Sequence, residues 1–152
     1  MNPVPHFAST PAALYLDLIE KCLTNTIYGD GYTDWRQPGV ERPFDPSLRE
    51  LGRDWPRRAH TMIGEVRLRN LRDLVETVIR ERVQGDLIET GAWRGGACVL
   101  MRAALEAFGD FERRVFVADS FEGFPLPTRK PIPSIAATIT TRSRSFRSRS
   151  TR

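Results

Sequence analysis

The stretch GDLIETGAWRGGACVLM, residues 85–101, decides the fold. Its apolar run ends in Glu89, a bend with three glycines follows, and apolar residues then recur at helical spacing over residues 94–108. A second short apolar run, VFVAD at residues 115–119, follows a basic turn and ends in Asp119. A strand, a helix and a strand joined by such short connections predict a βαβ unit with parallel strands in an α/β fold.

Helices are predicted around this unit. Residues 12–23 follow Pro11 and have apolar residues three and four apart, and residues 60–83 fit two helices or one broken helix. Gly109 stands where a helix over residues 94–108 would end. The side chains expected to face the core are Leu14, Leu18 and Cys22, with Tyr15, Ile19 and Leu23 beside them, and then Val99, Leu100, Ala103, Ala104 and Ala107.

Residues 24–57 are rich in Gly, Pro, Asp and aromatic residues. This composition predicts irregular structure with one short helix around residues 47–52. A long loop in a compact domain is often functional, so a lid over a binding site is one interpretation. A surface connection without a role is the other.

Composition argues against several classes of protein. No apolar run approaches the about 20 residues that span a membrane, and the N-terminus lacks the basic and apolar regions of a secretory signal. Cys22 and Cys98 each lie in an apolar, helix-like segment, which favours reduced core thiols over a disulfide or a metal site. We therefore expect a cytoplasmic protein without a membrane partner.

The net charge of +4 comes from the C-terminal segment. Residues 128–152 hold seven Arg and Lys and no acid, which leaves 16 basic against 19 acidic residues in 1–127. The segment lacks apolar periodicity, so we expect disorder. A nucleic-acid-binding tail and a terminus without a role are two interpretations. We favour a third, an out-of-frame translation, because Arg, Ser, Thr and Pro are typical of GC-rich coding sequence read in the wrong frame.

The acids at the two strand ends indicate the ligand. Ligands of open parallel sheets bind beyond the carboxyl ends of the strands, where Glu89 and Asp119 are both expected. A dinucleotide site would show G-x-G-x-x-G and would avoid a carboxylate that repels the pyrophosphate. S-adenosylmethionine has no phosphate, and its ammonium, sulfonium and ribose diol suit two carboxylates. A structural turn with solvated acids, Asp119 serving as a cap, is the alternative interpretation.

Four segments resemble the macrocin O-methyltransferase family: LYLDLIEKCLTNTIYGD at 14–30, HTMIG at 60–64, ETGAWRGGACVLMR at 89–102 and VFVADSFEGFP at 115–125. The resemblance covers residues 12–127. It implies a class I, Rossmann-like methyltransferase fold with an incomplete sheet, in an S-adenosylmethionine- and Mg²⁺-dependent enzyme that methylates sugar hydroxyls in antibiotic biosynthesis. The implied domains are an N-terminal helix with a lid-like segment (1–57), helices with the first βαβ unit (58–127) and the tail (128–152).

The resemblance also implies the cofactor-binding residues. Glu89 would face the methionine end, Gly91 would allow close approach of the backbone, and Asp119 would accept hydrogen bonds from the ribose diol. Trp93 would close the pocket or pack in the core, and Arg94 would pair with the cofactor carboxylate or lie on the surface. The full set is Thr61, Met62, Glu89, Thr90, Gly91, Ala92, Trp93, Asp119, Ser120, Phe121, Glu122 and Gly123; His60 is either a site residue or a neighbour of a helix start.

The metal site of the family is not expected in this chain. The family's Mg²⁺ ligands are aspartates in an Asp-Gly-Asp strand end and an Asp-Asp pair downstream of residue 125, and this chain has no Asp or Glu after Glu122. A sugar hydroxyl is a poor nucleophile with a high pKa, which a divalent metal lowers as a Lewis acid, usually alongside a general base. We therefore expect a catalytically incomplete chain that holds no metal-ligating or catalytic residue, and an open sheet edge that makes it marginally stable.

The expected partner is a glycosylated natural product. Nucleic acid is not expected as a partner, and the sequence leaves the oligomeric state, the acceptor sugar and the general base open. Two alternative functions remain: a nucleotide- or dinucleotide-binding domain, and a nucleic-acid-binding protein that uses its basic tail.

Overall fold

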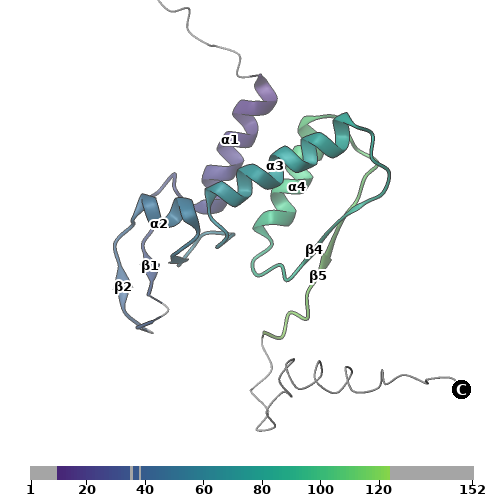
Figure 1. The fold of residues 1–152 in the computed structure, drawn as a ribbon. Coiled ribbons are helices and arrows are strands. Elements are labelled where there is room, and N and C mark those ends of the chain that lie inside the picture. The colour runs from purple at the N-terminus through teal and green to yellow at the C-terminus, as the bar shows by residue number, and fades with distance from the viewer. Residues whose placement is uncertain (1–9, 35, 38, 124–152) are drawn as a thin grey trace, which may run out of the picture. The chain divides into compact units, whose positions relative to one another are not determined.

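The computed structural model describes residues 10–34, 36–37 and 39–123 (Figure 1). The chain forms two compact units, Met1–Phe121 and Glu122–Arg152. The elements below all belong to the first unit. Residues 128–152, the tail for which disorder and a shifted reading frame are predicted, lie outside the described residues.

Three helices build the core. They are α1 (Pro11–Thr24), α3 (Glu65–Arg80) and α4 (Gly96–Ala107), and each contacts the other two. Residues 60–83 thus contain one helix where two or a broken one were expected. The fully buried side chains at the centre are Leu16, Leu68, Leu100, Ala104 and Leu105.

The expected buried face of α1 was wrong in part. Leu14 and Leu18 are 57% and 50% exposed, and Cys22 is exposed, so it is not a core thiol. Leu23 is buried and Ile19 is partly buried against the core, both as expected, and the helix also buries Leu16 and the charged Glu20. Glu20 tolerates burial because the guanidinium of Arg72 on α3 donates to its carboxylate at 3.4 Å. Apolar residues lie on both sides of this helix, so periodicity alone did not identify the face that packs.

Residues 24–57 are more regular than expected. The predicted short helix is present as α2 (Pro46–Leu51), but three two-residue strands accompany it: β1 (Tyr32–Thr33), β2 (Glu41–Arg42) and β3 (Trp55–Pro56). They form an antiparallel sheet in the order β2-β1-β3. Strands of two residues are too short to show an alternation, which is why the sequence did not predict them.

Arg49 of α2 holds this segment to the end of α1. Its side chain is 1% exposed, and its Nε donates to Asp54 at 2.6 Å. Nη1 donates to the carbonyl of Thr24 and Nη2 to the carbonyl of Asp30, the latter at 2.9 Å. One buried guanidinium therefore fixes the chain that follows α1.

The predicted βαβ unit is confirmed. Strands β4 (Leu87–Thr90) and β5 (Val115–Ala118) pair in parallel, with Leu87 opposite Val115, and α4 between them in sequence contacts both. Figure 1 shows the two strands side by side next to α4. The helix starts at Gly96, two residues later than expected, and Val99 is wrongly predicted as a core residue because it is 49% exposed. Val99 is one position from Leu100, so it points about 100° away from the face that packs.

Candidate functional site

The turn between β4 and α4 places backbone groups at the end of the sheet. Gly91 has a φ of 81°, in the left-handed region that favours glycine. Its N–H donates to the carbonyl of Ala118, the last residue of β5, at 3.0 Å. The turn therefore bends across the carboxyl ends of both strands, as the sequence predicted for a ligand site.

Glu89 points toward α4, and a thiol holds its carboxylate. The Sγ of Cys98 donates to Oε2 of Glu89 at 2.7 Å. Burial of Cys98, together with this carboxylate, raises the pKa of the thiol to about 12. Cys98 is therefore a protonated donor at neutral pH, and it fixes the orientation of Glu89. The sequence identified Cys98 as a core thiol but not its contact with the acid.

Asp119 ties the end of β5 to the turn. Its Oδ2 accepts from the N–H of Ala92 at 2.7 Å, and its Oδ1 accepts from the N–H of Phe121 at 3.0 Å. These backbone donors, that of Phe121 foremost, lower the pKa of Asp119, so the carboxylate is charged at neutral pH. Asp119 therefore has a structural role in the turn.

Residues 60–63 are brought to the turn by the first residue of α4. The N–H of Gly96 donates to the carbonyl of His60 at 2.9 Å, and a Cβ on Gly96 would lie 2.5 Å from that oxygen. The N–H groups of His60 and Thr61 donate in turn to the carbonyl of Leu23, at 2.8 and 3.3 Å. Gly96 is thus needed for close packing inside the protein, a role that the sequence did not distinguish from approach to a ligand.

These elements enclose a pocket of about 250 Å³, called the strand-end pocket below. Six of the twelve predicted residues line it, together with three that the sequence did not indicate: Thr61, Met62, Glu89, Gly91, Ala92 and Trp93, and then Gly52, Ile63 and Arg67. Arg67 on α3 brings a cation to the same pocket as Glu89. Its position depends on how α3 packs, so no local pattern could have identified it.

The other predicted site residues are placed differently. Asp119 is outside the lining but accepts from the N–H of Ala92, which is part of it, and Thr90, Ser120 and Phe121 are exposed residues outside the lining. Glu122 and Gly123 belong to the second unit of the chain, and their role stays a prediction.

Trp93 and Arg94 connect the turn to the N-terminal segment. Trp93 packs edge-on against Trp55 of β3, with 6.3 Å between ring centroids, and the guanidinium of Arg94 lies 4.3 Å from the centroid of the Trp93 ring. Nη1 of Arg94 donates to the carbonyls of Arg57 and Ala59 at 2.8 and 3.0 Å, and at 3.5 Å to that of Pro56. Arg94 is an exposed residue, as one of the two expectations has it, and it binds backbone of this chain. Trp93 both lines the pocket and packs against another aromatic residue.

Two absences apply to the described part of the chain. It contains no cluster of three or more His, Cys, Asp or Glu side chains that could hold a metal ion. It also has no helix with the length and apolar character needed to cross a membrane.

Comparisons with known proteins agree on one family. A sequence profile of the macrocin-O-methyltransferase (TylF) family matches residues 12–145, which extends past the expected limit at residue 127. A 4'-O-methyltransferase of Streptomyces olivaceus that acts on 8-demethyl-8-(2,3-dimethoxy-alpha-L-rhamnosyl)-tetracenomycin C is 57% identical over 112 residues, or 74% of this chain and 42% of that enzyme. The demethyldecarbamoylnovobiocin O-methyltransferase of Streptomyces niveus is 49% identical over 77% of this chain and 45% of its own length.

The mycinamicin III 3''-O-methyltransferase of Micromonospora griseorubida is also 49% identical, over 77% of this chain and 46% of its own length. The chain thus spans less than half the length of these curated relatives. A solved structure of the O-methyltransferase NovP is similar in fold, with a TM-score of 0.71 and 45% identity over 88% of this chain and 52% of that one. Because the family profile covers most of its length, this chain belongs to the macrocin-O-methyltransferase family.

Proposed function

We propose that this chain supplies the cofactor-binding part of an S-adenosylmethionine-dependent O-methyltransferase. The observation that carries the proposal is the pair of acids, Glu89 on β4 and Asp119 directly after β5, on either side of the Gly91 turn. The family supplies the reaction class. The acceptor we propose is a hydroxyl of a deoxyhexose in a glycosylated secondary metabolite, because one relative acts on an α-L-rhamnosyl compound.

The strand-end pocket suits the methionine end of the cofactor. Its volume of about 250 Å³ is below the roughly 300–1,000 Å³ of pockets that hold a whole drug-sized ligand. Glu89 can accept hydrogen bonds from the ammonium, and Arg67 carries the charge that attracts the carboxylate. A pyrophosphate in the same place would meet the negative charge of Glu89, which is why a dinucleotide fits less well.

Asp119 suits the ribose diol. Its oxygens accept backbone N–H groups, those of Ala92 and Phe121 at 2.7 and 3.0 Å, which hold the carboxylate in place at the end of β5. A diol presents two donors at the spacing of a carboxylate, so both hydroxyls can bind one side chain. Phe121, 73% exposed beside Asp119, offers a ring for the adenine.

The residues of this chain bind and orient; they do not complete the reaction. S-adenosylmethionine, when bound, supplies a methyl group activated by the positive charge of its sulfonium. A Lewis acid and a general base promote deprotonation of the sugar hydroxyl. We assign the Mg²⁺ ligands to family residues downstream of Glu122, where this sequence has no Asp or Glu, and expect no methyl transfer by the 152 residues alone. A cytoplasmic location suits the two free thiols, Cys22 and Cys98.

Calorimetric titration of the full chain with S-adenosylhomocysteine and with NAD tests the proposal. We expect S-adenosylhomocysteine to bind and NAD to give no heat of binding. Glu89→Gln should weaken S-adenosylhomocysteine binding about tenfold or more, because a charged partner of the ammonium is lost. Asp73→Asn, an exposed acid on α3 outside the pocket, serves as the control. Binding of NAD in place of S-adenosylhomocysteine would overturn the proposal.

A further inference from the structure

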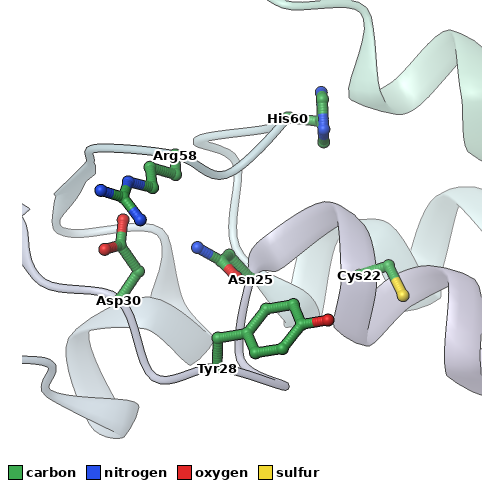
Figure 2. A pocket seen from close by; sticks show the side chains of 6 residues that line it. All are labelled: Cys22, Asn25, Tyr28, Asp30, Arg58 and His60. Atoms are coloured by element: carbon green, nitrogen blue, oxygen red, sulfur yellow. The ribbon is translucent and has the colours of Figure 1, made fainter.

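A second and larger pocket lies where α1 ends. It has a volume of about 540 Å³ and is called the α1-end pocket below. Figure 2 shows its side chains reaching in from two stretches of chain, residues 22–30 and residues 58–60. Its lining residues are Cys22, Asn25, Tyr28, Asp30, Arg58 and His60. None of these residues lines the strand-end pocket, and none belongs to the hydrophobic core cluster.

One wall of this pocket carries an unsatisfied acid. Oδ2 of Asp30 is buried, and within the described part of the chain it has no hydrogen-bond partner. The backbone around it is fixed, because Arg49 donates to the carbonyl of Asp30 at 2.9 Å and also to that of Thr24. Buried polar atoms in native proteins almost always have a partner. A ligand that donates a hydrogen bond would supply the one missing here.

The remaining side chains favour a polyhydroxylated ligand. The lining includes the Asp30 carboxylate, the Arg58 guanidinium, the Asn25 amide and the Tyr28 ring (Figure 2). Together they offer an acceptor, a charged donor and an amide that is both. Tyr28 is 84% exposed, so its ring is free to cover an apolar face. A sugar ring presents this combination, with hydroxyl groups at its edge and C–H groups on its faces.

Consecutive residues of one segment line the α1-end pocket and the strand-end pocket. His60 lines the first, and the next two residues, Thr61 and Met62, line the second. The segment is held on both sides, since its His60 N–H binds Leu23 and its His60 carbonyl binds Gly96. A sugar in the α1-end pocket would therefore lie next to the ligand of the strand-end pocket.

We infer that the α1-end pocket binds the sugar ring of the acceptor, with Asp30 accepting from its hydroxyl groups and Tyr28 covering one face. This inference rests on the proposed function, because it places the acceptor beside the methyl donor. It assigns to residues 22–30 a role in substrate recognition.

The test uses methyl α-L-rhamnopyranoside and the full chain, with binding measured by saturation-transfer NMR and calorimetry. We expect the glycoside to bind, and Asp30→Asn and Tyr28→Ala each to weaken it about tenfold. Tyr28→Phe should retain most of the binding, because the ring remains. S-adenosylhomocysteine binding should change by less than about twofold in all three variants, since their side chains lie outside the strand-end pocket.

Two exposed positions outside the α1-end pocket provide matched controls, Tyr15→Ala on α1 and Asp73→Asn on α3, and neither should change glycoside binding. Because Tyr28 is exposed, its variants are expected to fold even if Asp30→Asn does not, and circular dichroism checks this. A chain that binds S-adenosylhomocysteine but not the glycoside overturns the inference and leaves the proposed function standing. Glycoside binding that survives Tyr28→Ala also overturns it. Failure to bind S-adenosylhomocysteine counts against the proposed function itself.

Discussion

The helical core and the β4–β5 pair differ in how much of their apolar surface they bury. Leu100, Ala104 and Leu105 on α4 are fully buried, whereas Ile88 on β4 and Phe116 on β5 are 63% and 47% exposed. Leu87 and Val115, their neighbours on the other face, pack against the core. The helices thus bury their apolar side chains against one another, while within the described residues the sheet is covered on one face. Parallel sheets are usually covered on both faces, so the strands are the part of this chain that depends most on further contacts.

Truncation at the centre of the core should have the largest effect. Leu100→Ala removes a fully buried side chain and should lower the free energy of unfolding by about 2–5 kcal/mol, measured by urea denaturation. Val99→Ala on the same helix should change the free energy of unfolding by about 0.5 kcal/mol or less, apart from the difference in helix propensity between Val and Ala, since Val99 is half exposed. Equal costs for the two variants would remove the contrast between core and surface on α4.

A side chain at Gly96, the first residue of α4, should have the next largest effect on stability. In Gly96→Ala the new atom would lie 2.5 Å from the carbonyl oxygen of His60, so residues 60–62 or the start of α4 must move. We expect a cost of about 1–3 kcal/mol in the free energy of unfolding, typical of overpacking. S-adenosylhomocysteine binding, measured by calorimetry, should weaken as well, because Thr61 and Met62 line the strand-end pocket. A variant with wild-type stability and affinity would show that this contact is not tight in solution.

The thiol that joins α4 to β4 should make stability depend on alkaline pH. The pKa of Cys98 is raised from 9.0 to about 12, so above pH 9 the unfolded chain loses a proton that the folded chain retains. Stability should therefore fall between pH 9 and 12, by at most about 1.4 kcal/mol per pH unit from this group. Cys98→Ser should remove that slope in urea denaturation curves, and Cys22→Ser, at an exposed thiol, should leave it unchanged. Identical slopes in both variants would contradict the assignment.

The exposed face of the sheet should govern association more than stability. Replacing Ile88 and Phe116 together with Thr, which suits a strand, should change the free energy of unfolding by about 0.5 kcal/mol per site or less. Light scattering at rising protein concentration should decrease, because exposed apolar strands promote association. Phe111→Thr, at a 65% exposed residue outside the sheet, is the matched control. If it lowers the scattering as much, the sheet face is not responsible.

The sequence predicted the elements better than their surroundings. The βαβ unit, the short helix α2 and the two strand-end acids were predicted from local patterns. A run of apolar residues, a glycine or an acid can be recognised without knowing how the rest of the chain packs. The buried face of α1 was predicted wrongly at Leu14 and Leu18, because the choice between Leu14 and Leu16 depends on where α3 and α4 lie. Arg67 was missed for the same reason. Each error is one of packing between elements distant in sequence, which short-range periodicity does not encode.

Arg94 affects how mutational data on this chain would be interpreted. Its guanidinium donates to the backbone carbonyls of Pro56, Arg57 and Ala59. Substituting the side chains of these three residues leaves those acceptors in place. A scan that reads function alone would rank Arg94 with the ligand-binding residues, and the same scan would find its partners tolerant. In this chain, therefore, loss of function on substitution of Arg94, without loss on substitution of the residues it contacts, indicates a structural role for the arginine and not a catalytic one.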